Sequence, residues 1–202
     1  MKTQILKVVA ALTIMASAAV YVGCERENAP HTTAPITNDA GVRIFEAPEV
    51  ETVVAEARIT AEFQEMEQAM ARQGYRPRFD LAAGGETDGT MTNGVRGAVV
   101  MVPFEKDGNA ASGAVIRIVS MNDRTPSLSA AAFRAVEGEL VAEQIDLGHG
   151  LGLQGAWWNC FWRCLLNGCG PGVVGCLWAG PAWWQCSLAV CGATAIVCSI
   201  TC

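Results

Sequence analysis

The sequence has little histidine and no cluster of basic residues. It contains 2 histidines, and its 14 lysines and arginines are scattered along the chain. Residues 24–150 carry 11 basic and 20 acidic side chains, which gives them a net charge of −9. A protein that binds nucleic acid needs clustered Lys and Arg to replace phosphate counterions, so we expect no nucleic-acid partner.

Groups suited to catalysis are also few. His31 and His149 lie in segments without apolar periodicity, where a histidine is ordinarily exposed to solvent. Glu65 and Glu67 are expected on a helix surface, and no isolated acidic pair suggests acid–base chemistry. The glycine-rich stretches lack the residues that complete a phosphate-binding loop. We therefore expect a protein that is not an enzyme and needs no cofactor.

Cysteine is absent from residues 25–159 and then abundant. From Leu151 to Cys202 the only charged side chain is Arg163, and the same stretch holds eight of the nine cysteines and all six tryptophans. The pattern W-x-C-x-L-x2-C-G-x5-C begins at Trp162 and again at Trp184, an offset of 22 residues. An even number of cysteines in a repeated frame is typical of a disulfide scaffold. We predict disulfides for Cys160, Cys164, Cys169, Cys176, Cys186, Cys191, Cys198 and Cys202.

Other interpretations of these cysteines stay open. Residues 182–201 are uncharged and long enough to span a membrane, although cysteines recur through them in register. Metal binding is disfavoured because the segment has no C-x2-C pair and no histidine, so we expect no metal site. Thioether links from a modifying enzyme are a further alternative. Eight cysteines allow 105 pairings, and the sequence does not choose among them.

The N-terminus resembles a bacterial export signal. Lys2 and Lys7 precede an uncharged apolar stretch, Val8 to Val22, which is shorter than a membrane span. The sequence Val22-Gly23-Cys24 is similar to a lipobox, so we predict a signal peptide over residues 1–23 and lipidation of Cys24. A plain secretory signal or a retained anchor are the alternatives. The protein is expected outside the cytoplasm, as a cell-envelope lipoprotein or a secreted protein, where disulfides persist.

The middle of the chain predicts an acidic α+β domain, residues 49–147, behind a flexible tether, residues 24–48. Ile59, Phe63, Met66 and Met70 lie on one face of a helix that runs from Glu49 to Arg72.

Residues 79–95 are expected to form a loop, followed by a hairpin of strands 97–104 and 114–121. Residues 129–147 suit a helix or a second hairpin, and Gly138 favours the hairpin. The fold class is therefore α+β, with one helix on a small antiparallel meander.

A glycine-rich hinge, residues 148–156, precedes the C-terminal region, residues 157–202. Gly148, Gly150 and Gly152 make this hinge a candidate site of proteolytic processing. The C-terminal region is expected to form two or three short helices that the disulfides join into a mini-domain. Its apolar aromatic side chains are candidates for membrane contact: Trp157, Trp158, Trp162, Trp178, Trp183 and Trp184.

The layout resembles halocin-like cysteine-rich bacteriocin precursors, in which an export signal and a longer N-terminal part precede a hydrophobic peptide rich in Cys, Gly and Ala. The eight C-terminal cysteines carry the resemblance, together with Gly168, Gly170 and Gly192. The resemblance implies a membrane-active C-terminal peptide. The single charge, the six tryptophans and the hinge suggest that this peptide acts on membrane lipid once released, and lipidation of Cys24 would make membrane lipid the anchor as well. The acidic domain is expected to shield or carry the peptide by direct contact. The alternative is a non-toxic envelope lipoprotein whose C-terminal region is a binding or anchoring module.

Overall fold

The computed structural model of the protein describes residues 37–38, 41–106, 109–122, 124–136, 139–143 and 155–202. The predicted signal peptide, Cys24 and the hinge glycines Gly148, Gly150 and Gly152 lie outside the described residues. Residues 35–202 form one compact unit.

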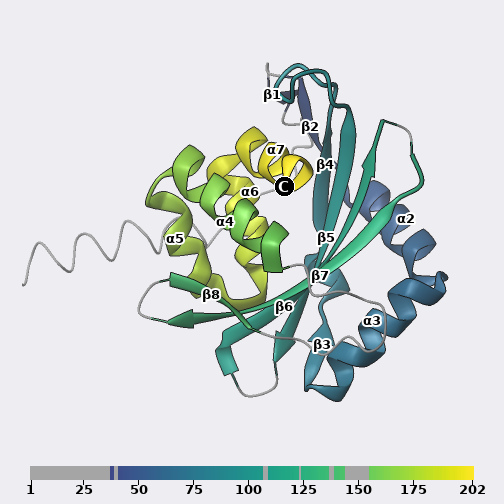
Figure 1. The fold of residues 1–202 in the computed structure, drawn as a ribbon, viewed down its shortest axis with the longest axis vertical. Coiled ribbons are helices and arrows are strands. Elements are labelled where there is room, and N and C mark those ends of the chain that lie inside the picture. Colours follow the sequence, from purple (N-terminus) through teal and green to yellow (C-terminus); the bar gives the residue numbers. More distant parts are fainter. Residues whose placement is uncertain (1–36, 39–40, 107–108, 123, 137–138, 144–154) are drawn as a thin grey trace, which may run out of the picture. The chain divides into compact units, whose positions relative to one another are not determined.

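An antiparallel sheet of eight strands forms the centre of this unit (Figure 1). The strand order is β1-β2-β4-β5-β6-β7-β8, and β3 pairs with β5 beside this path. The longest strand is β6, and it pairs with β5 in a hairpin with ten paired positions, as the sequence predicts. The strands are β1 Thr37–Asn38, β2 Val42–Ile44, β3 Tyr75–Pro77, β4 Ala83–Thr87, β5 Gly97–Lys106, β6 Asn109–Met121, β7 Ser127–Val136 and β8 Glu139–Glu143.

The sheet is larger than the sequence predicts at its N-terminal side. β1 and β2 lie in the segment expected to be a tether, and β4 lies in the segment expected to be a loop. Glycine is unfavourable in a strand, which is why the Ala-Gly-Gly sequence of β4 indicated a loop. Gly85 has a packing role instead, because a Cβ there would lie 2.4 Å from the Arg43 carbonyl oxygen. β7 and β8 pair as antiparallel strands, which confirms the second hairpin and not the helix for this segment.

Two helices occupy the segment predicted as one helix. They are α2, Ala47–Arg58, and α3, Ala61–Arg72, and the break between them falls at Ile59 and Thr60. Thr60 is the N-cap of α3, since its hydroxyl oxygen accepts a hydrogen bond from the Phe63 amide at 3.3 Å. Ile59, predicted on the apolar face, is 80% exposed because of this break.

The C-terminal helices are α4 Gly155–Cys169, α5 Gly172–Cys176, the 3-10 helix η2 Leu177–Ala182, α6 Trp183–Cys191 and α7 Ala193–Thr201. They cover one face of the sheet, and α2 and α3 cover the other (Figure 1). Alternation along β5 serves both layers: Val99 and Met101 pack against the C-terminal helices, and Val100 and Val102 pack against α2 and α3. The α+β class, with an antiparallel sheet and a helical region joined by four disulfides, is confirmed.

Within the described part of the chain, none of the helices alone has the length and apolar composition of a membrane span. The segments Ala179–Cys191 and Ala193–Thr201 meet these criteria only as a pair, and the pair is bent by 116°.

Candidate functional site

The face between the sheet and the C-terminal helices is built around an aromatic cluster. Phe133, on β7, stacks on Trp158 of α4 with ring centroids 4.8 Å apart and planes 4° from parallel. Trp183, at the start of α6, meets the Phe133 ring edge-on at 5.4 Å and the Trp158 ring edge-on at 5.5 Å. Stacked and edge-to-face pairs at these distances are favourable beyond the area that they bury. Phe133 is thus a sheet side chain that packs directly within the tryptophan cluster of the C-terminal helices.

Five of the six tryptophans predicted to contact a membrane face this interface or the core of the C-terminal region. They are at most 8% exposed: Trp157, Trp158, Trp162, Trp183 and Trp184. The side chain of Trp178 lies outside the described part of the structure. These five side chains can meet a membrane only if the C-terminal helices leave the sheet, because the protein's own strands and helices now cover them.

One helix lies very close to the sheet. Gly85 and Gly97 face α7, where a Cβ would come within 3.0 Å of the side chains of Ile196 and Ile200 respectively. Trp184 adds a directional contact, because its indole Nε1 donates a hydrogen bond of 2.8 Å to the Ala83 carbonyl oxygen. Close packing and this hydrogen bond fix the position of α6 and α7 on β4 and β5.

The eight C-terminal cysteines form four disulfides, as predicted. The pairs are nested: Cys160–Cys202, Cys164–Cys198, Cys169–Cys191 and Cys176–Cys186. Residues 25–159 contain no cysteine, so none of these bonds connects the C-terminal region to the sheet. Multiple disulfides are typical of proteins that fold in an oxidising compartment outside the cytoplasm.

The nested pairing follows the internal repeat. The first, second and third cysteines of one copy bond to the third, second and first cysteines of the other copy. The middle bond, Cys169–Cys191, therefore joins equivalent positions of the two copies. Two copies that run in opposite directions bring their cysteines together in this order, so the repeat encodes a cross-linked helical hairpin.

A buried cation lies beneath the first turn of α4. Arg117, on β6, is 7% exposed, and its guanidinium carbon is 4.9 Å from the centre of the Trp157 ring. Among the residues that the structure describes, its Nε and Nη1 have no hydrogen-bond partner, and neither does the hydroxyl of Ser129, which is opposite Arg117 on β7. Burial lowers the pKa of Arg117 to about 10. Because a cation–π contact is ordinarily worth less than the cost of burying an unpaired charge, we expect the contact with Trp157 to offset only part of that cost.

Replacing Arg117 with methionine should therefore stabilise the protein by about 1–3 kcal/mol, because an incompletely compensated buried charge is removed and most of the side-chain volume is kept. The gain should appear in chemical denaturation at pH 7 and shrink above pH 10, where the wild-type arginine deprotonates more easily in the folded state. Arg134→Met is the matched control on β7, since the Arg134 side chain is 54% exposed and the expected change is under about 0.5 kcal/mol. A loss of stability in Arg117→Met would show instead that the contact with Trp157 outweighs desolvation.

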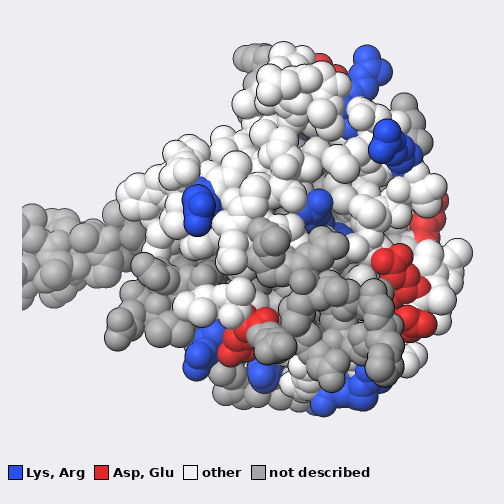
Figure 2. Space-filling model, in the orientation of Figure 1, with Lys and Arg blue, Asp and Glu red and all other residues white. Residues whose placement is uncertain are grey.

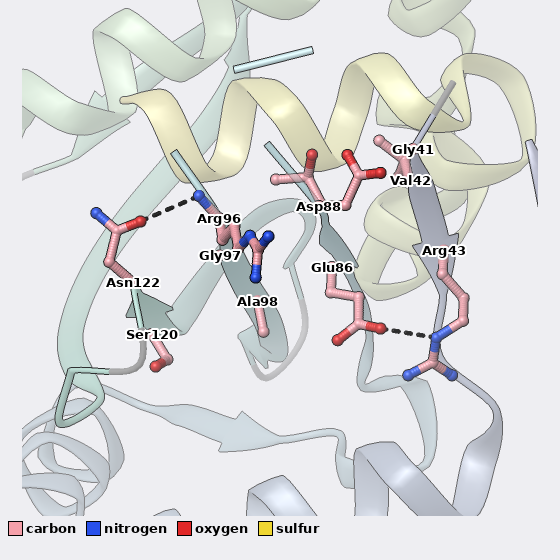
Figure 3. A pocket seen from close by; sticks show the side chains of 11 residues that line it. Gly41, Val42, Arg43, Glu86, Asp88, Arg96, Gly97, Ala98, Ser120 and Asn122 are labelled. Atoms are coloured by element: carbon pink, nitrogen blue, oxygen red, sulfur yellow. Dashed lines mark hydrogen bonds and ion pairs between the residues drawn. The ribbon is translucent and has the colours of Figure 1, made fainter. Parts of the chain in front are cut away.

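A polar cleft of about 460 Å³ lies between β2, β4 and β5 (Figure 3). Three of its four charged lining side chains, Arg43, Glu86 and Asp88, have hydrogen-bond partners within the protein. The Arg43 guanidinium bonds to Glu86 and Glu49 at 2.8 Å, and the contact with Arg43 helps the Glu46 amide to hold the pKa of Glu49 below its ordinary value. Asp88 accepts a hydrogen bond from the Thr90 amide, which lowers the pKa of its carboxyl group.

Figure 3 shows the Asn122 side chain directed at the Arg96 backbone, whose amide donates to Asn122 Oδ1 at 3.1 Å. These contacts order the end of the sheet. The described residues hold no group of three or more Cys, His, Asp or Glu side chains that could bind a metal ion. We therefore place the candidate functional site at the face between the sheet and the C-terminal helices.

No family model, curated protein or solved structure matches this chain.

The sequence indicated the cysteines and tryptophans of this site but not its sheet residues. Phe133 carried no signal of its own, because it is one apolar residue among several in its strand. The arginine could have been suspected, since Arg117 falls inside the apolar run from Ala114 to Val119. A charge within such a run lies either at an exposed edge or in a buried position that needs an explanation.

Proposed function

We propose that this protein is the exported precursor of a cysteine-rich, membrane-active peptide. The peptide is the C-terminal region, and the acidic domain carries it with its tryptophans covered until the chain is cut within the hinge, residues 148–156. Membrane lipid is then both the anchor of the precursor, through Cys24, and the target of the released peptide.

One observation carries this proposal. The five tryptophans whose side chains the structure describes are buried in the core that the C-terminal helices share with the sheet, yet the four disulfides all lie within the C-terminal region itself. A cut in the hinge would leave a peptide that is internally cross-linked and held to the sheet by noncovalent contacts alone. Its single charged residue, Arg163, suits transfer from the sheet to an apolar phase.

The test is a protein with a specific protease site in place of Gly148–Gly152. After cleavage we expect the two fragments to co-elute in size exclusion, because the interface stays buried, and to separate when liposomes are added. The peptide should then release a dye trapped in the liposomes, whereas uncut protein should release little. A purified cleaved peptide that leaves liposomes and bacterial indicator cells intact would refute the proposal.

The second candidate is an envelope lipoprotein whose C-terminal region is a permanent binding or anchoring module. The shared core favours it, because Phe133, Trp158 and the Trp184–Ala83 hydrogen bond make the C-terminal helices part of the domain. The intact mass of the exported product separates the two functions. A fragment beginning near residues 148–156 that gains eight alkyl groups only after reduction supports the precursor, and a full-length lipidated chain supports the module.

A further inference from the structure

The face of the sheet opposite the C-terminal helices carries a groove that the proposed function does not use. The groove, of about 300 Å³, lies between α2, the start of α3 and the middle strands of the sheet. Its floor is apolar and comes from both layers: Phe45, Val53, Val100, Ile118 and Leu128. This volume is at the small end of ligand pockets, so it accommodates one or two aliphatic side chains and not a whole helix.

The groove has carboxylates and no basic group among its lining residues. Glu56, near the end of α2, and Glu62, in the first turn of α3, are exposed beside the apolar floor. Neither carboxylate takes part in an ion pair within the part of the chain that the structure describes. Figure 2 shows acidic side chains gathered over the side of the molecule where Figure 1 places α2. A cation placed here would gain two charge contacts without displacing a partner.

An exposed aliphatic side chain extends the apolar surface at this place. Ile59 is 80% exposed and lies in the chain between Ala57 and Thr60, which both line the groove. A single exposed isoleucine is ordinary, but one beside an apolar groove enlarges the area that a partner could bury. The break between α2 and α3 is what turns Ile59 outwards.

We propose that this groove binds a basic peptide segment of a partner protein, with one or two aliphatic side chains on the apolar floor and flanking Lys or Arg side chains at Glu56 and Glu62. The site lies on the α2–α3 face, so it is independent of the release of the C-terminal region.

The test uses the full-length protein and the labelled peptide Ac-Lys-Lys-Leu-Leu-Lys-Lys-amide, with fluorescence anisotropy as the readout. We expect saturable binding that weakens with added salt, and no binding of Ac-Glu-Glu-Leu-Leu-Glu-Glu-amide. Glu56→Gln/Glu62→Gln should weaken binding by about fivefold to tenfold, because two rim contacts are lost. Val53→Ser should weaken it several-fold through the apolar floor.

The matched control is Glu51→Gln/Glu65→Gln, which removes the same charge from exposed positions on the same two helices outside the groove. It should change the affinity less than twofold. Equal weakening by both pairs would overturn the proposal in favour of a general attraction to an acidic surface. Failure of the basic peptide to bind, or self-association through Ile59 that the peptide does not compete with, would overturn it as well.

Discussion

Replacing Phe133 with alanine should destabilise the protein by about 3–5 kcal/mol, the usual cost of truncating a buried aromatic side chain. The ring is 6% exposed and contacts both Trp158 and Trp183, so its loss opens a cavity in the centre of the interface. The effect should be larger on the docking of the C-terminal helices than on the sheet. Tryptophan fluorescence measures this directly, because all six tryptophans belong to the C-terminal region.

The matched control is Phe63→Ala on the opposite face of the sheet, where Phe63 is fully buried between α3 and the strands. Its free-energy cost should be similar, but its fluorescence and far-ultraviolet circular dichroism transitions in denaturant should coincide. In Phe133→Ala the fluorescence transition should occur at a lower denaturant concentration than the circular dichroism transition. Coincident transitions in both variants would contradict separate docking and show that the two layers unfold as one unit.

The strands were predictable where a local pattern and a turn signal agree. Val and Ile runs around the Asp107-Gly108 sequence predicted the β5–β6 hairpin, and Gly138 predicted that β7 and β8 are strands. β4 was missed because Gly84 and Gly85 lower strand propensity, and their reason for being there is the close approach of other chain segments. Such a reason is tertiary, so no local pattern contains it.

The helix break and the tryptophan environment were missed for related reasons. Ile59, Phe63, Met66 and Met70 keep helical spacing across the break. Thr60 lies at the break, because its hydroxyl donates to the Ala57 carbonyl oxygen at the end of α2 and accepts from the Phe63 amide at the start of α3. The composition of an apolar segment rich in tryptophan does not distinguish a segment that contacts a membrane from one that is buried in a protein core. The sheet face that covers it is supplied by residues of β2, β5, β6 and β7, and their convergence becomes visible only in the fold.

Reducing all four disulfides should unfold the C-terminal helices. In a nested set, each outer bridge adds only a short loop to the one already closed by the bridge inside it. By the loop-entropy relation each bridge then contributes about 2–3 kcal/mol to the free energy of unfolding. Four bridges together contribute on the order of 10 kcal/mol, which is comparable to the whole stability of an ordinary domain. A region of this size has a marginal core without cross-links, so the reduced helices should leave the sheet.

The measurement is thermal unfolding followed by tryptophan emission, before and after reduction and alkylation. The oxidised protein should show one cooperative transition from a blue-shifted native signal, and the reduced protein should emit at long wavelength with little transition.

Removing the innermost bridge alone, with Cys176→Ala/Cys186→Ala, should lower the free energy of unfolding by about 3 kcal/mol, the value that the loop-entropy relation gives for a loop of 10 residues. Alkylation without reduction is the control and should change nothing. If the reduced protein kept its blue-shifted signal and its cooperative transition, contacts such as Phe133–Trp158 would be sufficient to hold the C-terminal helices, and the bridges would matter only after release.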